Sequence, residues 1–281
     1  MQDSETDGRC SGGIKPLALT CAVPHYASSE GGIITVIGSG GKTSLIWLLA
    51  QQGRREGTRT LVTTTTHMAF PPPESGWYDY FLDFPHTVPD GFKPAPGISL
   101  AGIREGPAGK GRGPSPQILA SLAPRFDRVL IEGDGSRMLP LKAWADYEPV
   151  VPTYTTVTLG ILPLWPVGLP VSSERIHRLP LFSALTGAQP GEILELHHLA
   201  PVITGMAREH PHSGQGLFSK AQGKKLLFFN QVEDEAGLNR AEALVSLLPG
   251  AFLRELSGII IGSVQQNRTY PPRRVHHPLT K

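Results

Sequence analysis

A glycine-rich segment that ends in a lysine and two hydroxyl residues has the clearest chemical meaning in this sequence. Its members, in chain order, are Gly38, Ser39, Gly40, Gly41, Lys42, Thr43 and Ser44. Glycines let backbone N–H groups approach phosphate oxygens, and a helix that follows directs its positive end toward the anion. The lysine reaches the β- and γ-phosphates, and the threonine hydroxyl binds magnesium. The segment therefore predicts a site for Mg²⁺ and ATP or GTP, with Lys42 in a catalytic role.

The loop is shorter than the longest form of this motif. Val36 stands where that form has glycine, which leaves the pattern Gly-x-x-Gly-Lys-Thr. The alternative is a glycine-rich turn between a strand and a helix that binds no phosphate. Lys42 and Thr43 stand where the helix is expected to begin, which favours the phosphate site.

Two carboxylates follow a second apolar run, at residues 127–132. Glu132 and Asp134 lie on the same side if the strand continues that far. A carboxylate in this place binds magnesium, often through water, or orients a water molecule. Both are candidate catalytic and metal-binding residues, and the sequence leaves open which one contacts the metal. The alternative is a turn formed by Gly133, Asp134 and Gly135.

Four threonines and a histidine end another expected strand, at residues 63–67. Ligands of open α/β sheets bind at the carboxyl edge of the strands, so Thr65 or Thr66 is a candidate ligand of magnesium or phosphate. The threonines also suit a strand for their β-propensity alone. We expect Thr65 to be the metal ligand.

Four basic residues are candidates for an anionic substrate or a phosphate group: Arg137, Lys142, His177 and Arg178. A solvated basic surface is the alternative. Asn230 follows the expected strand at residues 225–229, where guanine-specific proteins with this loop carry Asn-Lys-x-Asp. Here Gln231 and Glu233 replace the lysine and the aspartate. The match is partial, so contact of Asn230 with the base and the choice between ATP and GTP both stay open.

The elements that must position these residues alternate along the chain. Apolar, β-branched runs predict strands near residues 33–37, 60–64, 98–102, 127–132, 157–162, 225–229 and 258–263. Helical patterns cover residues 43–52, 117–123, 181–186, 196–199 and 238–248. This order predicts an α/β fold like that of P-loop NTPases, with a mostly parallel sheet and helices on both faces.

The expected organisation is one nucleotide-binding domain, residues 31–264, with a loop-rich insertion near residues 71–116. Residues 1–30 are expected to be a tail or leader, and residues 265–281 a disordered tail. The net charge of +2 over 281 residues, without a basic stripe, excludes a typical nucleic-acid binder. The longest apolar stretch, residues 161–171, contains three prolines, so no membrane span is expected. The two cysteines suggest free thiols and a cytoplasmic protein.

Taken together, these motifs resemble the YqeC family of selenium-dependent hydroxylase accessory proteins. The resemblance is carried by residues 36–44, 62–66, 131–136, 140–142, 148–152, 176–178 and 230–232. It covers residues 31 to 264 and departs at Gly133, where the family carries alanine, and at the prolines near residue 71.

The resemblance implies a role in maturing a selenium-dependent molybdenum hydroxylase, by making or inserting its cofactor. The hydroxylase or its cofactor would then be the partner. One hypothesis is an NTPase or a phosphoryl or nucleotidyl transferase. The other is a nucleotide-gated insertion factor or chaperone with little turnover of its own.

Overall fold

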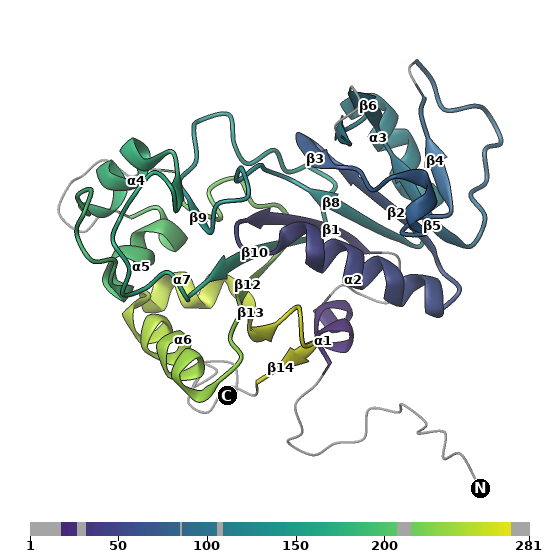
Figure 1. The fold of residues 1–281 in the computed structure, drawn as a ribbon. Helices are drawn as coiled ribbons and strands as arrows, with labels where there is room; N and C mark the ends of the chain where they lie inside the picture. The colour runs from purple at the N-terminus through teal and green to yellow at the C-terminus, as the bar shows by residue number, and fades with distance from the viewer. Residues whose placement is uncertain (1–17, 27–31, 85, 106–108, 207–214, 271–281) are drawn as a thin grey trace, which may run out of the picture.

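A nine-stranded sheet forms the centre of this computed structural model, which describes residues 18–26, 32–84, 86–105, 109–206 and 215–270 (Figure 1). Its spatial order is β14 (Arg268–Thr269), β13 (Leu256–Ser263), β12 (Lys224–Asn230), β10 (Val157–Pro163), β1 (Gly32–Gly38), β8 (Arg128–Glu132), β2 (Arg59–Thr64), β5 (Gly97–Ala101) and β4 (Tyr80–Leu82). Neighbouring strands are parallel except for β13 and β14. The predicted α/β class with a mostly parallel sheet is thus confirmed.

Seven helices accompany the sheet within the described ranges. They are α1 (Leu19–Tyr26), α2 (Lys42–Arg55), α3 (Pro116–Leu122), α4 (Leu179–Thr186), α5 (Leu196–Thr204), α6 (Glu235–Leu247) and α7 (Gly250–Glu255). Two short 3₁₀ turns add Pro73–Ser75 and Ala123–Arg125. No helix in these ranges is long and apolar enough to span a bilayer.

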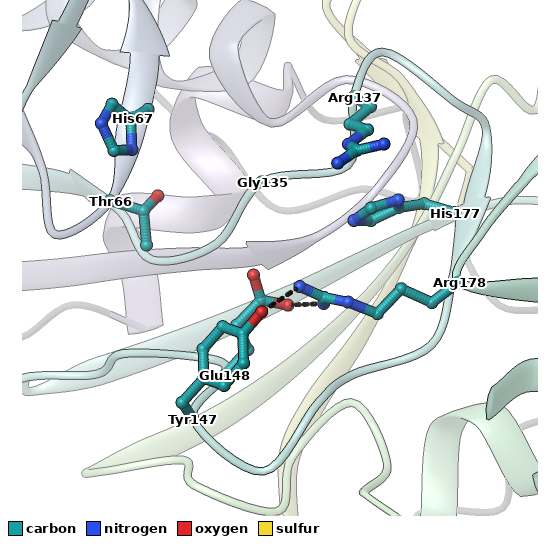
Figure 2. A pocket seen from close by; sticks show the side chains of 8 residues that line it. All are labelled: Thr66, His67, Gly135, Arg137, Tyr147, Glu148, His177 and Arg178. Carbon is teal, nitrogen blue, oxygen red and sulfur yellow. Dashed lines mark hydrogen bonds and ion pairs between the residues drawn. The ribbon is translucent and has the colours of Figure 1, made fainter.

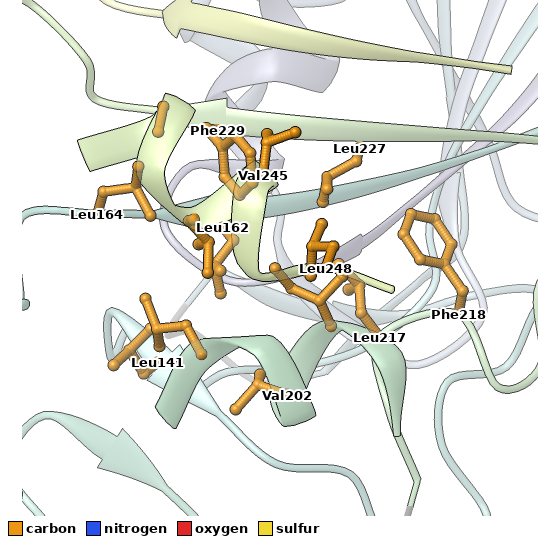
Figure 3. Packing of buried hydrophobic residues seen from close by; sticks show 14 of the residues in the cluster. Leu141, Leu162, Leu164, Val202, Leu217, Phe218, Leu227, Phe229, Val245 and Leu248 are labelled. Atoms are coloured by element: carbon orange, nitrogen blue, oxygen red, sulfur yellow. The ribbon is translucent and has the colours of Figure 1, made fainter. Parts of the chain in front are cut away.

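Alternating side chains of the central strands enter different hydrophobic clusters, because successive residues of a strand point to opposite faces. On β12, Leu226 and Phe228 pack with α1 and α2, whereas Leu227 and Phe229 pack with α5 and α6. Figure 3 shows this second cluster, with Val245 against the strand. A third cluster joins α3 to β2 and β8. Burying a leucine or phenylalanine contributes about 1.5–3 kcal/mol, so both faces stabilise the sheet.

Two small sheets stand apart from the central one. β3 (His67–Ala69), β7 (Lys110–Arg112) and β6 (Ile103–Glu105) form an antiparallel sheet, and β9 (Leu141–Lys142) pairs with β11 (Ile176–His177) in parallel. The segment expected to be loop-rich, residues 71–116, contains β4 and β5, which extend the central sheet, and β6 and β7. The strand expected at residues 98–102 is β5. Residues 106–108 of this segment lie outside the described ranges.

The ordered fold extends beyond residues 31–264 at both ends. Leu19 and Val23 of α1 are buried in the cluster that also contains Ile260 of β13. The N–H group of Thr20 donates to the side chain of Asn267, at 3.2 Å, next to β14. Apolar burial of α1 and this hydrogen bond therefore hold the two end segments on the sheet. The rest of the expected tails, residues 1–17, 27–30 and 271–281, lies outside the described ranges, as does Cys10.

Candidate functional site

The glycine loop connects the end of β1 to the start of α2 and lies against two neighbouring strands. The N–H group of Ser39 donates to the carbonyl of Ile161, at 3.0 Å. Gly38 has φ +102°, and a Cβ there would lie 2.2 Å from the Ile161 oxygen. A Cβ at Gly40 would lie 2.4 Å from the ring of Pro163. No side chain fits at either position, so the backbone itself lines this turn.

The start of α2 presents free backbone donors to the loop. Gly41 is the N-cap, no side chain caps the helix, and its first turn has no acidic residue. Within the described part of the chain, the buried hydroxyl of Ser39 has no hydrogen-bond partner. Uncapped N–H groups at the positive end of a helix favour an anion. These features fit a bound phosphate group.

Lys42 is folded back over the loop. Its Nζ donates to the carbonyl of Gly38, at 2.6 Å, and lies 3.4 Å from Oδ1 of Asp134. Only 4% of Lys42 is exposed. The lysine is therefore at the loop already, and these two contacts use only two of its three N–H donors.

The two acids of the second motif have different surroundings. Asp134 is fully buried and accepts hydrogen bonds from the Gly38 N–H group, at 3.1 Å, and from Nε1 of Trp144, at 2.6 Å. Its oxygens thus hold the loop in shape. Glu132 lines the cavity in front of the loop and accepts a hydrogen bond from Oγ1 of Thr43, at 2.7 Å. The geometry favours Glu132 over Asp134 as the residue next to a metal.

Burial raises the pKa of Glu132, and the charge of Lys42 and the hydrogen bond from Thr43 oppose only part of that rise. Among the described residues, no group of three or more His, Cys, Asp and Glu side chains is placed to hold a metal. Magnesium typically takes one or two carboxylates together with water and phosphate oxygens. Thr43 and Glu132 fit that role only with a phosphate ligand present.

The threonines after β2 join it to neighbouring segments. The hydroxyl of Thr64 and the N–H group of Thr65 both donate to the carbonyl of Glu132, at 2.8 and 3.0 Å. The hydroxyl of Thr65 donates to the carbonyl of Val150, at 2.7 Å. Thr65 keeps its oxygen lone pairs, so its role as a metal ligand stays a prediction.

Asn230 braces the loop from the end of β12. Its Nδ2 donates to the carbonyl of Gly40, at 2.7 Å, and its Oδ1 accepts from the N–H group of Val264, at 2.9 Å. Only 2% of the residue is exposed. Contact of Asn230 with a base stays a prediction. The neighbouring Gln231, rather than Asn230, lines the cavity.

A cavity of about 1070 Å³ opens in front of the loop. Besides residues 40–44 and Glu132, it is lined by His67, Met68, Ala69, Lys110, Ser136, Arg137, Met138, Leu139, Pro140, Trp165 and Gln231. We call it the loop cavity. Trp165 and Met138 were not expected here from the sequence. Both are exposed apolar side chains outside the regular elements, and no spacing pattern connects them to the loop.

A second cavity of about 540 Å³ lies beside it. Its lining is Thr66, His67, Gly135, Arg137, Tyr147, Glu148, His177 and Arg178. Figure 2 shows Thr66 and His67 on one side and three basic side chains on the other. Three of the four expected substrate residues thus meet here: Arg137, His177 and Arg178. His67 and Arg137 line both cavities.

Lys142, the fourth expected substrate residue, lies buried behind the second cavity. Its Nζ is 3.1 Å from Asp134 and 3.1 Å from Glu148, and Arg178 pairs with Glu148 in turn. Together with Lys42, these residues form a chain of alternating charges that runs from the loop cavity to the second cavity. We call it the charge chain.

The electrostatics of Glu148 follow from this chain. Burial alone would raise the pKa of Glu148, but the hydrogen bond from Arg178 and the charge of Lys142 outweigh it and lower the pKa. The carboxylate therefore stays ionised beside its two cations.

Comparison with known proteins places these residues in one family. The sequence model of the family described as YqeC protein matches residues 34–180. A protein from Escherichia coli (strain K12), named "Uncharacterized protein YqeC", is 32% identical over 267 residues, which cover 94% of this chain and 98% of that protein. The family match includes both acids and the basic residues of the second cavity.

Proposed function

Starting from the fact that the chain belongs to the YqeC family, we propose that it binds Mg²⁺ together with ATP or GTP at the loop of residues 38–44. The fold would then be that of a P-loop NTPase. The proposal rests mainly on the junction between β1 and α2. At that junction, one end of the loop cavity brings together the glycines, the uncapped start of α2, Lys42 and the Thr43–Glu132 pair.

Each residue has a defined part in this proposal. The loop N–H groups bind the phosphate oxygens, and Lys42, which already lies at the loop, donates to the terminal phosphates. Thr43 and Glu132 hold Mg²⁺, which would neutralise charge on the phosphates. Glu132 also stands where a base or water-orienting group would act. Asp134 positions the loop through Gly38.

We further propose that the nucleotide serves the maturation of a selenium-dependent molybdenum hydroxylase, as the family resemblance implies. In the first form of the proposal, the protein is an NTPase or a phosphoryl or nucleotidyl transferase that modifies a second substrate. In the second form, nucleotide binding switches a factor that inserts the cofactor. The presence of a second polar cavity beside the loop cavity favours the first form.

The test is equilibrium binding of labelled ATP and GTP, with magnesium, to the wild type and to Lys42→Ala. We expect one nucleotide to bind with a Kd of about 1 μM or tighter, and the variant to lose at least about tenfold, or 1.4 kcal/mol. Lys93→Ala, at an exposed lysine outside both cavities, is the matched control. If the folded wild type binds neither nucleotide, the proposal is wrong.

Turnover separates the two forms of the proposal. Hydrolysis or transfer by the purified protein supports an enzyme. Tight binding with negligible turnover, stimulated by a molybdenum hydroxylase, supports a gated insertion factor. The preference between ATP and GTP also tests Asn230, because a base-reading asparagine with an acid nearby favours guanine.

A further inference from the structure

We infer that the second cavity binds an oxyanion group, a carboxylate or a phosphate, of a second substrate while the nucleotide occupies the loop cavity. This inference rests on the proposed nucleotide function and adds the chemical class of the second ligand. The cavity volume of about 540 Å³ suits a small metabolite. Its lining combines two guanidinium groups, two imidazoles and two hydroxyl side chains with a single carboxylate.

Arg137 offers a guanidinium group to the second cavity. Its side chain is exposed, and no hydrogen bond or ion pair to a protein acid holds it within the described ranges. Arg137 and Met138 have φ +52° and +62°, a left-handed conformation that is rare for residues other than glycine. Such conformations occur at ligand sites, where the surrounding structure maintains them. Here the turn carries a free guanidinium between the two cavities.

The charge chain brings further cations to the second cavity. It contains three cations, Lys42, Lys142 and Arg178, against two carboxylates, Asp134 and Glu148. The carboxylate of Glu132 also interacts with Lys42 and Lys142, so these charges balance and Arg137 adds one positive charge in excess. A nucleotide phosphate would use Lys42 at one end of the chain. An oxyanion at the other end would meet Arg178 and Arg137, whose planar guanidinium groups match carboxylate and phosphate oxygens.

The neutral donors complete the lining. Burial, above all, lowers the pKa of His177, and the charges of Arg178, Lys142 and Arg137 lower it further against the opposing charge of Glu148. The lowered pKa favours the uncharged imidazole of His177, which has one donor and one acceptor nitrogen. The hydroxyl oxygen of Tyr147 accepts a hydrogen bond from Nη2 of Arg178, at 2.9 Å, which leaves the hydroxyl proton for another acceptor. The His177 imidazole and the Tyr147 hydroxyl would orient an oxyanion without adding positive charge to the cavity.

The shared lining relates the two ligands. His67 and Arg137 line both cavities, so a ligand in the second cavity and the phosphates at the loop would contact common side chains. A second substrate held in this way lies beside the reacting end of the nucleotide. That is the arrangement that a transferase or a ligand-stimulated NTPase needs.

The experiment is calorimetric titration of the full chain, with its loop cavity saturated by Mg²⁺ and a non-hydrolysable ATP or GTP analogue. The probes are inorganic phosphate and, separately, malonate, which distinguish the two oxyanion types. We expect at least one probe to bind, and Arg137→Gln to weaken it at least about tenfold. Arg55→Gln, an equal charge change in the last turn of α2, should leave it unchanged.

Nuclear magnetic resonance of the His177 ring gives an independent readout. A bound oxyanion stabilises the protonated imidazole, so the pKa of His177 should rise when the probe binds, and less so in Arg137→Gln. Failure of both probes to bind, or equal binding by the wild type and Arg137→Gln, would overturn the inference. If the nucleotide itself fails to bind, the proposed function is wrong, and the titration without nucleotide decides the inference alone.

Discussion

The glycine loop and the second cavity lie side by side but are built in opposite ways. The loop is seven consecutive residues, and its shape depends on backbone groups packed against β10 and β12. The second cavity is assembled from segments near residues 66, 136, 147 and 177, and its shape depends on charged side chains. The loop is a single segment whose shape is fixed by steric contacts. The second cavity joins several segments through electrostatic contacts.

Asp134 belongs to both regions. Its carboxylate accepts hydrogen bonds from the Gly38 N–H group of the loop and from the Nζ of Lys142 behind the second cavity. The two regions therefore differ in construction but share one buried acid. Substitutions that act on the loop, on the cavity or on this acid should have different sizes and different signatures.

The largest effect is expected for Asp134→Asn, which tests whether the two regions are joined. The change removes a buried negative charge between Lys42 and Lys142, so both cations lose a partner. We expect a loss of about 3–5 kcal/mol in the free energy of unfolding, measured in denaturant. Asp127→Asn, at a half-exposed acid paired with Arg59, is the control. A loss below about 1 kcal/mol for Asp134→Asn would mean that the regions are independent.

Gly38→Ala tests the steric account of the loop. The added Cβ would meet the Ile161 carbonyl at 2.2 Å in a backbone conformation with φ +102°. We expect a loss of about 3 kcal/mol in stability. Gly57→Ala is the matched control, because Gly57 also has a positive φ, +71°, but nothing lies within 4 Å of its Cβ. That variant should lose only about 1 kcal/mol. Equal losses would show that contact with β10 is unimportant.

Asn230→Ala tests how the loop is braced from outside. It leaves the Gly40 carbonyl and the Val264 N–H group without their partner, which costs about 2 kcal/mol. Nucleotide affinity should fall as well, for ATP and GTP alike. Gln231→Ala changes the adjacent, exposed residue and should leave stability within about 0.5 kcal/mol of the wild type. A loss of GTP affinity alone in Asn230→Ala would instead indicate direct contact with the base.

The smallest effect concerns the pH dependence of the second cavity. The pKa of Glu148 is lower in the folded protein than its ordinary value, so its ionised form stabilises the fold. That contribution is present above the ordinary carboxyl pKa and is lost as the pH falls through the lowered one. Glu148→Gln lacks it at every pH. The stability difference between wild type and variant, measured by urea unfolding, should therefore shrink toward acid pH, and a constant difference would contradict this account.

The sequence predicted the glycine loop better than the second cavity. The loop, the strands on either side of it and the acids after β8 follow from consecutive residues, and the structure brings Lys42, Thr43 and Glu132 together as expected. The burial of Lys142 did not follow, because only the pairing of β9 with β11 places it between Asp134 and Glu148. The brace by Asn230 likewise depends on contacts between residues far apart in the chain. Contacts between residues so far apart leave no periodic pattern in the sequence.

The two outermost strands of the sheet have a consequence for the behaviour of the protein in solution. β4 has three residues, so the edge that it forms presents few unpaired backbone groups. β14 has two residues and pairs only with Gly262 and Ser263, so within the described residues most of β13 has no strand partner on its outer side. Edge strands this short are poor templates for strand addition by another molecule. A sheet of nine strands would otherwise be at risk of edge-to-edge aggregation. The three-residue strand β4 lowers that risk at one end of the sheet, whereas the other end presents the outer side of β13.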